Sequence, residues 1–245
     1  MKDIIIDSLK YSSSNWVKVL LLGLVVFLVD LSDALSFLGG LAGEVSFTII
    51  VAGLILGIYQ IGFIFRIVEE TTHGSDNMPK FDKFWNTFLH GMKEGLVTVI
   101  YFIIPLILII IGVFLFGDLI GPNPMDMELV IIVFVLFLAS ITYLIYQAAV
   151  LNMANHHGTI KSAFDFKRIF KKARDMGIKR LGFIYLLTVV FAVTVESTIH
   201  DAVTSNPFDL LSIISALLIA PFILIFIARA LGLINRTLEF EKKCN

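Results

Sequence analysis

The sequence predicts an all-α, polytopic membrane protein. Of its 245 residues, 58% are hydrophobic and the mean hydropathy is +0.91, whereas soluble domains contain about 45–50% apolar residues. All 19 lysines and arginines lie in four polar stretches, and the three stretches between them (30–44, 118–128 and 196–209) contain nine carboxylates and no basic residue. By the positive-inside rule, the basic stretches and both termini face the cytoplasm, so we expect a cell-membrane protein.

Six apolar runs separate these polar stretches. A helix needs about 20 residues to cross about 30 Å of hydrocarbon, and four uncharged runs meet this length: 45–65, 95–117, 129–151 and 210–228. Two further runs end in acids: 16–38, which contains Asp30 and Asp33, and 181–200, which contains Glu196. We count both as spans, because without them the basic stretches would alternate between the two sides. The sequence therefore predicts six transmembrane helices.

The chain is expected to form a single integral membrane domain, residues 1–245. Its length leaves no room for an added soluble domain of about 100 residues. The single cysteine, Cys244, excludes an internal disulfide and a thiolate metal site. Lysines precede the first run and acids follow it, so we expect that run to be its own insertion signal, without a cleavable signal peptide. Inside the spans, Gly53-x-x-x-Gly57 predicts close helix packing, and Pro105 and Pro221 predict kinks.

The chain also reads as three copies of one unit, a cytoplasmic amphipathic segment followed by a transmembrane hairpin. The units cover about 1–74, 78–158 and 161–236, and a short cytoplasmic tail, 237–245, follows. His73-Gly74 recurs as His157-Gly158, and Phe81-Asp82 recurs as Phe164-Asp165. Each unit has two spans, so the repeats would be parallel and related by an axis along the membrane normal.

Two of the amphipathic segments carry an apolar stripe at helical spacing. The stripes are Phe81, Phe84, Trp85, Phe88 and Met92, and then Phe166, Ile169, Phe170, Ala173 and Met176. Five candidate lipid-binding cations accompany the second stripe: Lys167, Arg168, Lys171, Lys172 and Arg174. This pattern is typical of an interfacial helix on anionic lipid, where five cations contribute on the order of 5 kcal/mol before screening. Alternatively, the stripes pack against the cytoplasmic ends of the spans.

Other polar residues near the membrane are also candidates. Arg66 and Arg229, at the cytoplasmic ends of two spans, are expected to be snorkelling anchors, with lipid-phosphate binding as a second role. His73, His156 and His157 could form a metal site only if the repeats bring their loops together, because a metal needs three or four convergent ligands.

A candidate ion or proton path consists of Asp30, Asp33, Glu196 and His200, near the outer surface. Glu196 and His200 are four residues apart and share a helix face, as a relay requires. The alternative is that these acids mark the frayed outer ends of short spans.

Catalytic signatures are absent from the sequence, with no Gly-x-x-x-x-Gly-Lys, Gly-x-Ser-x-Gly, His-Glu-x-x-His or Cys-x-x-Cys motif. We therefore expect no enzyme activity, no cofactor and no bound metal. The basic segments are short and adjoin the membrane, so they do not indicate nucleic-acid binding. The expected partners are membrane lipids and, beyond them, other membrane proteins.

One stretch resembles an uncharacterised archaeal membrane family, the domain of unknown function 4013. The residues that carry this resemblance are Gly62, Arg66, Gly74, Pro79-x-Phe81, Gly91, Tyr101 and Pro105. In that family an acidic run leads to a Leu-Pro pair, whereas here the run is Ser75-Asp76-Asn77 and Met78 replaces the leucine. The resemblance implies a multi-pass membrane protein and brings no known activity.

Two functions fit the sequence. The first is a non-enzymatic membrane-organising or assembly protein whose interfacial helices bind lipid or partners. The second is a small transporter or permease for an ion or small solute, with its path between the repeats. The recurring amphipathic segments and the lack of charges near the membrane centre favour the first.

Overall fold

The computed structural model describes residues 2–37, 43–116, 124–191 and 209–244, and within these ranges every regular element is helical, with no strand. The elements are α1 (Lys2–Ser12), α2 (Trp16–Phe37), α3 (Gly43–Thr72), α4 (Phe84–Phe116), α5 (Pro124–Asn155), the 3₁₀ helix η2 (Ile160–Phe164), α6 (Phe166–Phe191), α8 (Leu210–Ile214), the π-helical turn η4 (Ser215–Ile219) and α9 (Ala220–Cys244). The all-α prediction is confirmed.

Four helical segments are long and apolar enough to cross a membrane: Phe47–Thr72, Phe84–Gly112, Leu129–Asn155 and Leu210–Phe240. The α1–α2 pair, bent by 82°, would bring the number to five. These helices are consistent with a multi-pass membrane protein. The predicted span 181–200 lies partly outside the described residues, so six spans stay a prediction.

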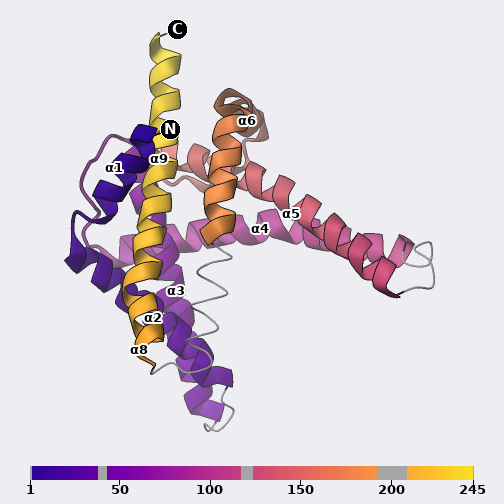
Figure 1. Ribbon diagram of the computed structural model, residues 1–245, viewed down its shortest axis with the longest axis horizontal. Helices are drawn as coiled ribbons and strands as arrows, with labels where there is room; N and C mark the ends of the chain where they lie inside the picture. Colours follow the sequence, from indigo (N-terminus) through magenta and orange to yellow (C-terminus); the bar gives the residue numbers. More distant parts are fainter. Residues whose placement is uncertain (1, 38–42, 117–123, 192–208, 245) are drawn as a thin grey trace.

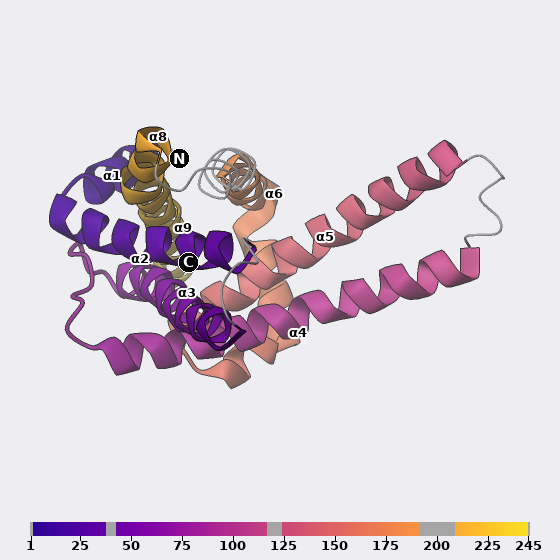
Figure 2. The same cartoon turned by 90° about the horizontal axis from the view of Figure 1, so that it is seen from below.

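The helices form two groups that diverge from one region (Figure 1). In the first group, α2, α3 and α9 run side by side; we call it the bundle. In the second, α4 and α5 leave together as a long hairpin, which the view from below shows clearly (Figure 2). We call the region where the groups meet the hub; it contains α1, the last three turns of α3, residues 73–83, the last turns of α5, η2, the first half of α6 and the middle of α9.

Glycines bring backbones close together in the bundle. Pro221 has no N–H for the Leu217 carbonyl four residues earlier, and here the helix forms the π turn η4, in which the Ala220 N–H donates to the Ser215 carbonyl. Gly23 of α2 lies against Leu217, so closely that a Cβ would overlap its carbonyl. The predicted contact at Gly53 is also present, where the glycine faces Ser32 of α2, while Gly57 faces open space.

The three segments that we predicted to be amphipathic join the helices after them in three different ways. The first, α1, bends sharply into α2, which begins where the Asn15 side chain accepts a hydrogen bond from the Lys18 N–H. The second is not a separate helix but the first turns of α4, because Gly91 packs directly on Gly62 of α3 and holds it in line. The third is the first half of α6, which kinks at Gly177, where φ is 72° and ψ is 159°.

Burial is concentrated at the hub. Phe63, Phe65, Leu151, Ile169 and Ile234 are fully buried there. By contrast, the most apolar window of Leu129–Asn155 contains no buried residue. Exposed apolar side chains of this density are suited to lipid. The parts of the helices that lie away from the hub are therefore the parts suited to face the membrane.

Candidate functional site

Arg229 of α9 is the centre of an internal polar cluster. It is 2% exposed, and its guanidinium donates to Asp7 Oδ1 at 2.8 Å, to Asp76 Oδ1 at 2.8 Å and to the Ser75 carbonyl at 2.6 Å. The guanidinium also lies 4.5 Å from the centre of the Tyr11 ring. Arg229 therefore links α1, the segment after α3 and α9, and this differs from the expected anchor at the membrane surface.

Asp76 takes part in this cluster from the segment that follows α3. The hydrogen bond from Arg229 holds the pKa of the Asp76 carboxyl below its usual range, and the charges of Arg229 and Arg236 act in the same direction. Burial opposes the shift only partly, since the Asp76 side chain is 74% exposed. The carboxylate thus stays charged and connected to α9.

Arg66 is also engaged within the protein. Its Nη1 donates to Thr87 Oγ1 at 2.8 Å and to the Lys80 carbonyl at 3.2 Å, while Nη2 pairs with Glu70 at 3.2 Å. Arg66 therefore holds α3 to the start of α4, and its side chain is 13% exposed.

The hub brings together two histidines that the repeat reading makes equivalent. The rings of His73 and His157 stack at 4.4 Å with an interplanar angle of 14°. The glycine after each histidine has a positive φ, 95° at Gly74 and 67° at Gly158. Glu69 lies beside this pair, with Oε1 3.7 Å from His157 Nδ1.

His156, the third candidate metal ligand, points elsewhere. Its Nδ1 donates to the Asn152 carbonyl at 2.8 Å, so Nε2 is the nitrogen that accepts from Arg168 Nη1 at 2.9 Å. Across the described ranges, no three His, Cys, Asp or Glu side chains are arranged to hold a metal ion. The loops converge, but these histidines form no metal site.

A cavity of about 440 Å³ opens beside His156. Its lining residues are Thr72, His73, Asn152, Asn155, His156, Arg168, Lys171, Lys172 and Glu239. Three of these residues are basic (Arg168, Lys171 and Lys172) and one is acidic (Glu239), so basic side chains outnumber acidic ones in the lining. We call it the basic cavity.

Asparagines fix one wall of the basic cavity. Asn235 of α9 donates to Asn155 Oδ1 at 2.7 Å and to Thr72 Oγ1 at 3.1 Å. Asn155 in turn donates to Glu239 Oε1 at 3.1 Å. This network joins α3, α5 and α9, and these helices and α6 supply seven of the nine lining residues.

The first half of α6 divides its predicted apolar stripe between two environments. Ile169 is fully buried and Met176 is 3% exposed, whereas Phe166 and Phe170 are 50% and 56% exposed. Among the five cations, four are exposed at the surface: Lys167, Arg168, Lys171 and Arg174. Lys172 is the exception, because it is 3% exposed and its ammonium donates to the Leu151 carbonyl at 3.2 Å. The packing alternative therefore holds for Ile169 and Met176, whereas lipid binding by the exposed part of the stripe stays a prediction.

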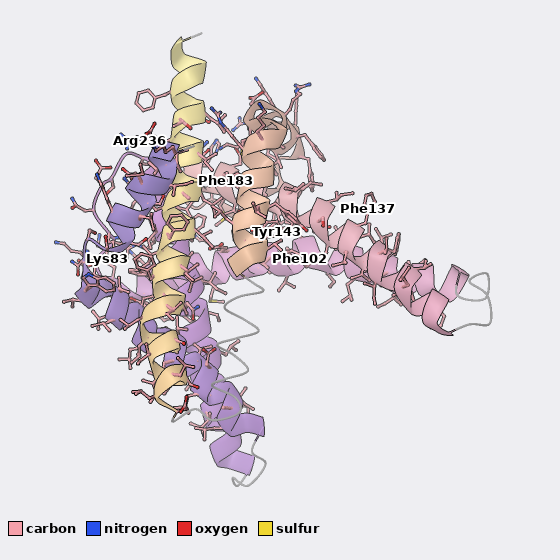
Figure 3. All side chains as sticks on the ribbon, in the orientation of Figure 1. Lys83, Phe102, Phe137, Tyr143, Phe183 and Arg236 are labelled. Carbon is pink, nitrogen blue, oxygen red and sulfur yellow. The ribbon has the colours of Figure 1, made fainter. Side chains whose placement is uncertain are left out.

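The first aromatic stripe is divided in the same way. Phe81 stacks on Phe63 at 4.3 Å, inside the hub. Trp85 and Met92 are 65% and 51% exposed. Lys83, labelled in Figure 3, marks the exposed start of this segment.

The candidate ion path is described only in part. Asp30 is half-buried on α2 and interacts with other groups. Asp33 is described only as a residue of that helix, and Glu196 and His200 lie outside the described residues. The proposed path therefore stays a prediction.

Sequence reasoning missed several residues of the hub. Asn235 and Glu239 lie beyond the predicted end of the last span, yet their spacing of four places them on one helix face. This spacing of polar residues predicts that the last helix continues into the predicted tail. It was the sequence signal that could have identified both residues. Glu94, placed just before the predicted span 95–117, lies within the apolar segment Phe84–Gly112.

Comparisons with known proteins identify one family. A family model described as a protein of unknown function, DUF4013, matches residues 45–235, which include three of the four apolar segments and most of the fourth. An uncharacterised protein of Methanocaldococcus jannaschii is 28% identical over 176 residues, covering 69% of this chain. The match covers 56% of that relative's length. No solved structure matches. The chain belongs to the DUF4013 family.

Proposed function

We propose that this protein is a non-enzymatic membrane-organising or assembly protein, and that its cytoplasmic hub binds anionic lipid. The observation that carries this proposal is the composition of one helix segment, the first half of α6. It exposes Phe166 and Phe170 and contributes Arg168 and Lys171 to the basic cavity. A helix that exposes an apolar pair and also lines a basic cavity suits a phospholipid, in which acyl chains and a phosphate are joined.

The energetics of surface binding follow from the four exposed cations. At about 1 kcal/mol per basic residue near an anionic leaflet, they contribute on the order of 4 kcal/mol before screening. Lys172 is left out of this sum because it is internal. Its role in the proposal is to line the cavity beside Glu239, from which its ammonium is 3.9 Å away.

The topology belongs to the same proposal. Six spans, both termini in the cytoplasm and three parallel repeats would place all the basic segments on one side. The stacking of His73 on His157, each followed by a glycine with positive φ, supports the repeats. Membrane lipids are the expected partners, other membrane proteins are further ones, and nucleic acid is not.

A small transporter or permease is the second candidate. Polar side chains between α4, α5 and α6 favour it, since Ser140 and Tyr185 share a hydrogen bond of 2.7 Å inside apolar segments. Transport would need a continuous route, and a route through the outer residues Asp30, Asp33, Glu196 and His200 belongs to this alternative.

Lipid retained by the purified full-length protein tests the first candidate. We expect more phosphatidylglycerol than phosphatidylcholine to be retained from a mixture, and the double variant Lys167→Glu/Lys171→Glu to lose this preference. The matched control is Lys10→Glu/Lys83→Glu, which changes the charge equally at exposed positions outside the cavity. If both variants lost the preference for phosphatidylglycerol equally, the preference would come from overall charge and not from the first half of α6. If the natural protein showed no such preference, the proposal would be refuted.

A further inference from the structure

Glu94 is a carboxyl group within an apolar segment of α4 that no described cation neutralises. Its Oε1 lies 3.4 Å from the Tyr146 hydroxyl of α5. Its Oε2 is inaccessible and has no hydrogen-bond partner among the described residues. No described lysine, arginine or histidine forms an ion pair with it; the nearby His90 faces Glu69 instead, at 3.8 Å. A buried carboxylate without donors is costly, so this arrangement requires an explanation.

The hydroxyl protons around Glu94 can be counted. The Thr98 hydroxyl donates its one proton to the Glu94 backbone carbonyl at 2.9 Å. The contact of 2.9 Å between Thr98 and Tyr146 then uses the phenolic proton, because each hydroxyl has only one. The contact of 3.4 Å from the Tyr146 hydroxyl to Glu94 Oε1 is the third and longest, so two hydroxyl protons serve three contacts. A neutral carboxyl could instead donate its own proton to the Tyr146 oxygen.

More polar groups continue from this point along α5. Gln147 is 7% exposed, its Nε2 donates to the Tyr143 hydroxyl at 2.6 Å, and its Oε1 has no partner within the described ranges. Ser140, one turn beyond Tyr143, bonds to Tyr185 of α6. Tyr143, labelled in Figure 3, lies where α5 passes α6. These groups share one face of α5 and lead from Glu94 into the apolar segment.

We propose that Glu94, with Tyr146 and Thr98, forms a binding site for one positive charge, either a proton or an alkali-metal cation. A proton would complete the hydrogen bond to Tyr146. A hard cation would instead take oxygen ligands, of which the carboxylate, the two hydroxyls and the unpartnered Gln147 oxygen are candidates. Interhelical hydrogen bonds alone would explain the hydroxyl pairs, but they would not explain why Glu94 Oε2 and Gln147 Oε1 are buried without a partner among the described residues. This inference is independent of lipid binding at the basic cavity.

Labelling of the full-length protein by dicyclohexylcarbodiimide tests the site. This apolar reagent takes up the proton of a neutral carboxyl on one nitrogen and bonds the carboxyl oxygen to its central carbon, with no leaving group. We expect mass spectrometry to find the adduct on Glu94, and its yield to fall about tenfold from about pH 6 to about pH 9, where buried carboxyls exchange their protons. The exposed carboxyls of Asp3 and Asp82 should stay unlabelled, because they lie in water and not in an apolar segment.

Two further arms decide between the ligands. If sodium chloride, but not choline chloride at equal ionic strength, protects Glu94, the ligand is an alkali-metal cation; equal labelling in both salts identifies a proton. Glu94→Gln should remove the adduct, and Tyr146→Phe should change the pH at which labelling falls. The proposal fails if the natural protein is not labelled at Glu94, or if labelling does not change with pH or salt. Both of these refuting results are measured on the natural protein, so they do not depend on whether a variant folds.

Discussion

The helices of the bundle and those of the hairpin are held to their neighbours by different interactions. In the bundle, Gly23 and Gly53 allow one helix to lie against the backbone or a short side chain of the next. In the hairpin, α5 contains no glycine, and side-chain hydroxyls connect it to its neighbours, as in the Ser140–Tyr185 pair. Lipid tails compete fully for apolar contacts, so close backbone packing and interhelical hydrogen bonds are what remain to hold helices together. The difference teaches that the bundle is specified by shape, whereas α5 is held to its neighbours by polar pairs.

The largest expected effect comes from filling a glycine contact in the bundle. Gly23→Ala would place a Cβ on the Leu217 carbonyl, where the neighbour is backbone and cannot rotate away. We expect the free energy of unfolding to fall by about 3 kcal/mol, the upper end of overpacking costs. Unfolding in a dodecyl sulfate titration of the purified protein measures it.

Gly57→Ala is the matched control, because this glycine of α3 meets nothing within 4 Å. Alanine is the better helix former by about 1 kcal/mol, so this variant should be as stable as the natural protein or more so. Equal losses at both positions would show that shape does not specify the bundle.

A smaller effect is expected in the hairpin region. Tyr185→Phe removes the hydroxyl that bonds to Ser140 and leaves the ring in place. Interhelical hydrogen bonds in membranes average about 0.6 kcal/mol, so we expect a loss of that size. The double-mutant cycle with Ser140→Ala isolates the pair by the same titration. A coupling energy of zero would mean that this hydroxyl pair does not hold α5 to α6.

Sequence reasoning predicted the apolar helices well, because hydropathy and charge asymmetry are local properties. The predicted starts at 16 and 210 agree with α2 and α8. It placed the start of the third span at 95, whereas α4 begins at Phe84. Lys93 and Glu94 look like a membrane boundary when each residue is judged alone, but Glu94 faces Tyr146, 52 residues away.

The same limit explains Arg229. A lone arginine at the end of an apolar run is most simply a surface anchor, and nothing nearby in sequence indicates otherwise. Its partner Asp7 is 222 residues away, and only the fold brings them together. The hub was thus predictable as a collection of basic segments but not as a set of specific pairs.

The smallest effect tests whether charge pairing at the hub adds to shape in the bundle. Because Arg229 lowers the pKa of Asp76, the charged form of Asp76 stabilises the folded state, and this contribution is present above the carboxyl's ordinary pKa of about 4. It is lost as the pH falls through the lowered folded-state pKa. Since Asp76 is 74% exposed, screening keeps the contribution to about 0.3 kcal/mol, the lower part of the range for exposed pairs. We expect Asp76→Asn to melt at a lower temperature than the natural protein at neutral pH, with the gap closing as the pH falls below about 4. A gap that persists in acid would assign the effect of the substitution to something other than this charge.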